Sequence, residues 1–110
     1  ATERRRAARV AFDLGSIDMG ALEALCRRWG VRRLALYGSA LRDDFGPESD
    51  IDVLVELAAD SPALGLTFFT LKFELEDLFG REVDLATPGS IYEPFRERIF
   101  STSRDVYVAA

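Results

Sequence analysis

Hydrophobic and polar positions recur along the chain at spacings that predict alternating helices and strands. Residues 18–29 are predicted to form an amphipathic helix, because Asp18 suits the N-cap position and Gly30 suits the position just past the end. The apolar residues of this helix recur at helical spacing: Leu22, Leu25, Cys26 and Trp29. Residues 31–37, which alternate in part, predict a strand.

The middle of the chain contains the strongest strand pattern. Residues 51–57 include three consecutive apolar residues, Val53 to Val55, which is typical of a central strand covered on both faces. Between the two strands, Gly38-Ser39 forms a turn that leads into a short helical piece through about Asp44, and residues 45–49 form a Gly-Pro loop.

A longer helix is predicted over residues 62–79, with Ser61 as cap, Pro62 at the first position and Gly80 just after the end. Its apolar set is broad: Leu64, Phe68, Phe69, Leu71, Phe73, Leu75, Leu78 and Phe79. Either the sheet and the neighbouring helix cover all of these residues, or some of them form part of an interface with a protein partner.

The remaining elements complete an α+β domain. Residues 82–86 predict a strand, residues 87–90 a turn, and residues 91–100 a helix with Phe95, Ile99 and Phe100 facing inward. Residues 105–109 form either a short edge strand or an extension of that helix. The order of elements predicts a two-layer arrangement in which helices flank a small mixed sheet.

Length and composition indicate one globular domain over residues 1–110, because the chain has 110 residues, 48% of them hydrophobic and 30% charged. No apolar stretch is long enough to span a bilayer, and the N-terminus lacks the apolar core of a signal peptide. A single cysteine excludes an internal disulfide framework and favours a reducing, cytoplasmic setting, with Cys26 as a buried structural thiol.

The charged residues exclude several kinds of chemistry. The chain contains no histidine, which removes Ser-His and Cys-His nucleophilic catalysis and His-based zinc sites, so that acid–base or metal chemistry falls to carboxylates. The net charge of −5 argues against strong nucleic-acid binding. Residues 1–12 are rich in arginine and are interpreted as a loose, solvated terminus, the alternative being a binding arm.

Two aspartates stand at the start of the strongest strand. Asp50 and Asp52 are two residues apart, so an extended chain points them the same way, and a divalent cation would relieve their repulsion. If strand 82–86 lies beside strand 51–57, Asp84 comes next to Asp52, and three carboxylates at one sheet edge can bind two Mg²⁺ ions. Alternatively, Asp50 simply caps a turn.

A Gly-Ser turn between a strand and a helical piece is a phosphate-binding feature, because it exposes backbone N–H groups and one hydroxyl. Gly38-Ser39 is followed by ten residues and then by Asp50-Ile51-Asp52. This combination resembles the signature of the polymerase β-type nucleotidyltransferase superfamily. The short length, "SDIDVLVE" and "GREVDLATP" resemble its smallest branch, the minimal nucleotidyltransferases, over about residues 18–108.

The resemblance implies an antitoxin that uses Mg²⁺ to transfer AMP from ATP to a tyrosine hydroxyl of a partner HEPN-domain toxin, with which it forms a hetero-oligomer. Gly38 and Ser39 would hold the triphosphate, and Asp50 and Asp52 would bind two metal ions. Asp84 would complete the catalytic triad as ligand or base. Arg42 matches an arginine that contacts phosphate, whereas Ala40 and Asp43 replace a frequent arginine and a frequent glycine.

Three further questions stay open at the level of sequence. Phe68-Phe69 or Tyr37 either stack near the nucleotide base or pack in the core. The chain is either an enzyme or a non-catalytic antitoxin that neutralises its partner by binding. As an enzyme, it acts on a protein, or alternatively on RNA or a small molecule.

Overall fold

A computed structural model of the chain describes residues 14–41, 46 and 49–110. The helices and strands in this part are α1 Met19–Arg28, β1 Val31–Tyr37, β2 Ile51–Leu57, α2 Phe68–Phe79, β3 Val83–Ala86, α3 Glu93–Thr102 and β4 Arg104–Val108. Short 3₁₀ turns cover Leu14–Ser16, Gly38–Leu41, Gly65–Thr67 and Pro88–Ser90. Residues 1–13, 42–45 and 47–48 lie outside the description, and with them the arginine-rich terminus and the end of the short helical piece after Gly38.

The strands form one mixed sheet in the order β3-β2-β1-β4. β2 pairs with β3 in parallel, whereas β1 pairs antiparallel with both β2 and β4. The prediction that residues 51–57 form a central strand is confirmed, and residues 104–108 form an edge strand rather than an extension of the preceding helix. The predicted α+β class is likewise confirmed, but helices cover both faces of the sheet, so the arrangement has three layers rather than the predicted two.

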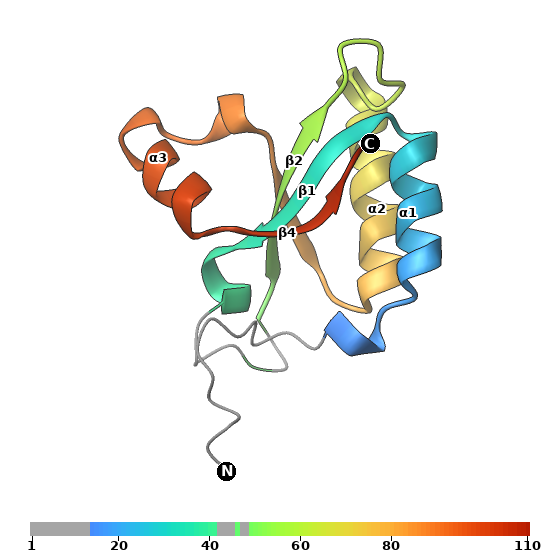
Figure 1. Cartoon of the computed structure of the whole chain (residues 1–110), viewed down its shortest axis with the longest axis horizontal. Coiled ribbons are helices and arrows are strands. Elements are labelled where there is room, and N and C mark those ends of the chain that lie inside the picture. Colours follow the sequence, from blue (N-terminus) through green and yellow to red (C-terminus); the bar gives the residue numbers. More distant parts are fainter. Residues whose placement is uncertain (1–13, 42–45, 47–48) are drawn as a thin grey trace.

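The two faces of the sheet are covered by different helices (Figure 1). α1 and α2 pack on the face that carries Leu34, Leu36 and Val53, and the larger core cluster lies between them. α3 packs on the opposite face through a smaller cluster built on Ala35, Leu54 and Ile91. Because successive strand residues point to opposite faces, the three consecutive apolar residues of β2 contribute to both cores.

The first helix forms where the pattern predicted it. The Ala21 N–H donates to Oδ1 of Asp18 at 3.1 Å, which confirms Asp18 as the N-cap. Leu22, Leu25 and Cys26 are buried, and Trp29 packs against the same core. Burial raises the pKa of the Cys26 thiol to about 12, with a smaller contribution from Glu23, so this cysteine is structural, as predicted.

The start of the second helix was predicted wrongly. Ser61 and Pro62 do not begin it; the chain passes through a 3₁₀ turn, and α2 begins only at Phe68. Gly65 has φ +76°, a left-handed conformation that an α-helix cannot contain, so the helix cannot extend back to Pro62. The predicted end is correct, because Gly80 follows Phe79 in the left-handed conformation of a C-terminal cap.

Two other apolar predictions need correction. Phe95 does not face inward: its side chain is 58% exposed and packs edge-on against Tyr92, because Ile91, just ahead of α3, occupies the inward position. Ile99 and Phe100 do pack on the smaller cluster. The alternative that the sheet and α1 cover the whole apolar set of α2 is also wrong, because four large side chains around this helix are exposed: Leu64, Leu66, Phe69 and Phe73.

Candidate active site

Three neighbouring strands bring Tyr37, Asp52 and Asp84 into one row. Tyr37 is paired with Asp52 across β1 and β2, and Asp52 is paired with Asp84 across the parallel strands β2 and β3. Residues paired directly across neighbouring strands project from the same face of a sheet. The prediction that β3 places Asp84 next to Asp52 is therefore confirmed.

This row lies on the α3 side of the sheet, at the end where β2 and β3 begin. Asp52 shares a face with Leu54, and Asp84 shares one with Ala86, and both of these residues pack against the α3 cluster. The other end of this face carries the ion pairs of Arg33 with Glu56 at 2.9 Å and with Asp105 at 2.7 Å. The carboxylates thus lie beyond the part of the face that α3 covers, with Asp52 half-buried and Asp84 exposed.

Gly38 is adjacent to the carboxylate of Asp52. Its φ is +60°, and a Cβ atom at this position would overlap Oδ2 of Asp52 and lie 3.3 Å from its Cγ. Glycine is therefore needed for two reasons, the left-handed backbone and the absence of a side chain. The first element of the predicted phosphate-binding turn is consequently in contact with one of the predicted metal ligands.

Tyr37 is a site residue to which sequence reasoning gave no firm role. Burial, together with smaller contributions from the negative charges of Asp52 and Asp84, raises its pKa to about 12. The phenol is therefore neutral at physiological pH and able to donate a hydrogen bond next to the carboxylates. The signal in the sequence was the position of Tyr37 directly before Gly38, because alternation along β1 points its side chain to the same face of the sheet as Asp52 on β2.

Asp50 directly precedes β2 and is exposed. Within the residues that the structure describes, no group of three or more His, Cys, Asp or Glu side chains is arranged to hold a metal ion. The structure thus brings together two carboxylates, those of Asp52 and Asp84, and the role of Asp50 as a third ligand stays a prediction. The pair itself fits Mg²⁺, which prefers carboxylate oxygens and commonly binds through one or two of them together with substrate phosphates.

The remaining predicted site residues are only partly described. Ser39 lies in the 3₁₀ turn Gly38–Leu41, which places its backbone directly after Gly38. Arg42 lies outside the described residues, as does Asp43. The phosphate-contacting role assigned to Arg42 is therefore still a prediction.

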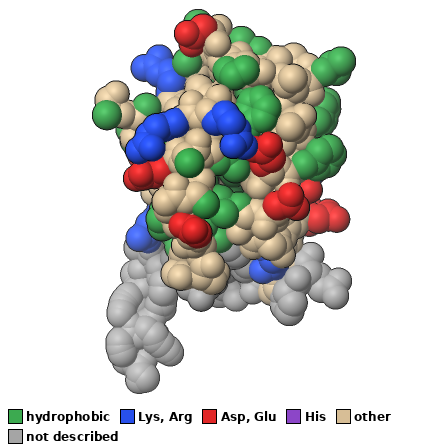
Figure 2. All heavy atoms as spheres, turned by 90° about the vertical axis from the view of Figure 1, so that its right-hand side faces the viewer, with side chains coloured by type: hydrophobic (Ala, Val, Ile, Leu, Met, Phe, Trp, Pro, Cys, Tyr) green, Lys and Arg blue, Asp and Glu red, His purple; other side chains and the backbone are tan. Residues whose placement is uncertain are grey.

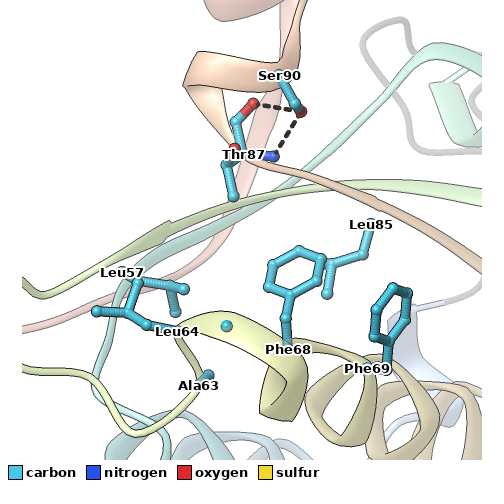
Figure 3. A pocket seen from close by; sticks show the side chains of 9 residues that line it. Leu57, Ala63, Leu64, Phe68, Phe69, Leu85, Thr87 and Ser90 are labelled. Carbon is cyan, nitrogen blue, oxygen red and sulfur yellow. Dashed lines mark hydrogen bonds between the residues drawn. The ribbon is translucent and has the colours of Figure 1, made fainter.

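A pocket of about 370 Å³ lies away from the carboxylates, between the start of α2 and the ends of β2 and β3 (Figure 3). Its lining is mainly apolar: Leu57, Ala63, Leu64, Gly65, Phe68, Phe69, Leu85, Thr87 and Ser90. The Ser90 hydroxyl accepts from the Thr87 N–H at 3.1 Å and donates to the Thr87 carbonyl at 2.9 Å. The lining contains no acid, base or thiol, so this pocket does not supply the chemistry.

Phe68 packs against the larger core cluster and Phe69 is exposed beside the pocket, so neither ring lies with the carboxylate row.

Comparison with protein families shows which family has this domain. The family model described as a nucleotidyltransferase domain matches residues 19–107. The chain belongs to the nucleotidyltransferase domain family. The matched residues include Gly38, both strand-start aspartates and Asp84, so the row of carboxylates lies inside the nucleotidyltransferase domain.

Curated relatives cover most of the nucleotidyltransferase. A Methanocaldococcus jannaschii protein, provisionally named a protein adenylyltransferase, is 40% identical over 77 residues, which are 70% of this chain and 81% of the relative. The protein adenylyltransferase MntA of Thermococcus cleftensis is 35% identical over 79 residues, 72% of this chain and 78% of the relative.

Solved structures share the fold. A chain described as a minimal nucleotidyltransferase, a designation given provisionally, matches with a TM-score of 0.64 and 29% identity, covering 77% of this nucleotidyltransferase and 85% of that chain. A toxin–antitoxin structure with AMP-PNP matches with a TM-score of 0.64 and 22% identity, covering 84% and 75%. A third structure, a tri-AMPylated Shewanella oneidensis HEPN toxin in complex with MNT antitoxin, matches with a TM-score of 0.54 and 21% identity, covering 83% and 70%.

Proposed function

We propose that the chain is an antitoxin that transfers AMP from ATP to a tyrosine hydroxyl of a partner HEPN-domain toxin. The observation that carries this proposal is the pairing of Asp52 with Asp84 beside Gly38, within a nucleotidyltransferase domain. Its relatives include proteins named protein adenylyltransferases, and structures of the same fold include an antitoxin in complex with an AMPylated HEPN toxin. These names support the choice of AMP, ATP and a protein acceptor.

In the proposed reaction the acceptor oxygen attacks the α-phosphorus of ATP. The new oxygen–phosphorus bond forms as the bond between the α-phosphorus and the bridging oxygen breaks, and pyrophosphate leaves. Asp50, Asp52 and Asp84 would bind two Mg²⁺ ions, which when bound make the hydroxyl more acidic and neutralise the leaving oxygens. The acceptor proton would pass to a carboxylate, with Asp84 the candidate because it is exposed beside Asp52.

Each other residue has a role that its position supports. Gly38 and the backbone of Ser39 would hold the triphosphate, because N–H groups at the start of a tight turn are good phosphate donors. Arg42 would contact a phosphate. Tyr37, neutral and paired across the strands with Asp52, would help to keep that carboxylate in place through its hydroxyl.

The test is transfer of α-labelled ATP, with Mg²⁺, to the purified cognate toxin and, separately, to total RNA. We expect label on the toxin, and in Asp52→Asn we expect that label to fall by roughly 100-fold or more, because the variant removes one of the charges that holds the metal. Asp77→Asn, which makes the same chemical change at an exposed position on α2, is the matched control and should transfer normally.

Each other outcome selects a different function. Label on RNA would show that the chain modifies a nucleic acid. If no label appears while toxin and chain still form a tight complex, and if Asp52→Asn neutralises the toxin as well as the wild type, the protein acts by binding alone.

A further inference from the structure

The short segment ahead of β3 holds the backbone on both sides of Asp50. Nη2 of Arg81 donates to the carbonyl oxygen of Ser49 at 2.9 Å, and the Ile51 N–H donates to the carbonyl oxygen of Glu82 at 2.9 Å. Asp50 lies between these two tethered peptide units. The direction in which its side chain leaves the backbone is therefore set by two consecutive residues of another segment.

Arg81 also binds the backbone of Gly46, which lies ahead of Asp50 in the chain. The same guanidinium nitrogen donates to the carbonyl oxygen of Gly46. Gly46 and Ser49 are also bonded to each other: the Ser49 N–H donates to the Gly46 carbonyl at 3.1 Å, and the Gly46 N–H donates to the Ser49 hydroxyl at 3.0 Å. Hydrogen bonds from a charged, half-buried donor are stronger than those between neutral groups, so Arg81 adds strongly to the bonds that fix the backbone of Gly46 and Ser49.

The segment that carries Arg81 is itself fixed to the core. The Val83 N–H donates to Oε2 of Glu76 at 3.0 Å, the same oxygen accepts from Lys72 at 2.7 Å, and the Val83 side chain is buried. Figure 1 shows the connection from α2 reaching the end of the sheet where β2 begins. One rigid connection therefore leads directly into Asp84 and also holds the backbone of Asp50.

We propose that Arg81 is a positioning residue of the metal site, which holds Asp50 where it can join Asp52 and Asp84 around a divalent cation. The inference rests on the proposed function, because it takes the three carboxylates as the metal ligands. Like charges oppose the approach of the three side chains in the absence of a cation. A tethered Asp50 has less backbone freedom to lose when the ion binds, so removing the tether weakens metal binding.

The experiment measures Mn²⁺ binding to the full chain by electron paramagnetic resonance, together with hydrogen exchange at the Ile51 amide. Arg81→Met removes the guanidinium but keeps much of the aliphatic stem, and we expect about a 10-fold loss of Mn²⁺ affinity with faster exchange at Ile51. Arg81→Lys keeps the charge without the planar fork and should lose less affinity. Arg27→Met removes the same charge from an exposed position on α1 and should bind Mn²⁺ as the wild type does.

Three results would overturn the inference. These are wild-type Mn²⁺ affinity in a folded Arg81→Met, unchanged affinity in Arg81→Lys if Arg81→Met fails to fold, and no Mn²⁺ binding by the wild type. The proposed function fails separately: if Arg81→Met binds Mn²⁺ about 10-fold more weakly than the wild type, but the wild type transfers no AMP, the positioning role stands and the AMP-transfer function does not.

Discussion

Gly38 determines whether the Asp52 carboxylate can occupy its place beside the turn that is proposed to bind phosphate. In Gly38→Ala the new Cβ overlaps Oδ2 of Asp52, and alanine also disfavours the φ of +60° by about 1 to 2 kcal/mol. We expect AMP transfer to fall by roughly 10- to 100-fold, because the Asp52 carboxylate must leave its present position beside Gly38. The measurement is the initial rate of label transfer to the toxin, with the free energy of unfolding determined on the same samples.

Gly80→Ala separates the two effects of that substitution. Gly80 has φ +70°, but a Cβ atom there would meet no other atom within 4 Å. This control should lose a similar 1 to 2 kcal/mol of stability and keep its transfer rate. Equal losses of activity in the two variants would show that backbone strain, rather than displacement of Asp52, explains the effect at Gly38.

At the scale of elements, local signals predicted most of the fold. The boundaries of β1 and β2 were predicted correctly, because alternating and continuous apolar runs are local properties. The start of α2 was not, since the capping signal of Ser61 and Pro62 competes with the left-handed conformation of Gly65, which sequence alone does not reveal. Whether an aromatic residue such as Phe95 faces inward depends on tertiary packing, since here Ile91 occupies the position in the smaller core cluster instead.

The candidate site likewise contains one feature that the sequence predicted and one that it did not. The adjacency of Asp52 and Asp84 follows from the pairing of their strands, and the sequence predicts it if the two strands are placed side by side. The role of Arg81 did not, because its partners are backbone carbonyls more than 30 residues earlier in the chain, and backbone groups carry no sequence signal.

Glu76 joins α2 to β3, and its environment predicts an acid-dependent contribution to stability. The ion pair with Lys72 and the hydrogen bond from the Val83 N–H lower the pKa of this carboxyl from its usual value of 4.5. The folded state therefore favours the charged form, so the contribution is complete above the pKa of the unfolded state and is lost as pH falls through the lower folded pKa.

In Glu76→Gln this dependence should disappear. We expect the variant to have a lower thermal midpoint than the wild type at pH 7, and the gap between the two midpoints should narrow as pH falls through the lowered folded pKa of Glu76. Glu97→Gln, at an exposed position on α3, should follow the wild type throughout. A gap that stays constant from pH 7 to pH 3 would mean that Glu76 acts through packing and not through its charge.

The whole molecule has two functional candidates on opposite faces of one sheet. The carboxylates lie on the α3 side, whereas the exposed apolar residues Leu64, Leu66, Phe69 and Phe73, here called the α2 patch, lie around the helix on the other side. Figure 2, which faces the side with α1 and α2, shows hydrophobic side chains projecting along one edge. Within the described residues no helix is long and apolar enough to cross a membrane. Exposed apolar groups of this size favour contact with another protein.

This separation predicts that binding of the toxin and the rate of AMP transfer depend on different residues and can be changed independently. Leu66→Ser combined with Phe73→Ser removes two exposed side chains without touching the buried residues of α2, so stability should change little. If the α2 patch holds the toxin, we expect the Kd of the complex to rise by about 10-fold, which corresponds to about 1.4 kcal/mol. At saturating toxin the rate of AMP transfer should stay at the wild-type value, because Asp52 and Asp84 lie on the other face. Val108→Ser, at an exposed position on β4, should alter neither quantity. These predictions are checked by calorimetric titration with the toxin, together with transfer rates at several toxin concentrations. A lower rate at saturating toxin would mean that the α2 patch also affects AMP transfer. An unchanged Kd would mean that the toxin binds elsewhere on the chain.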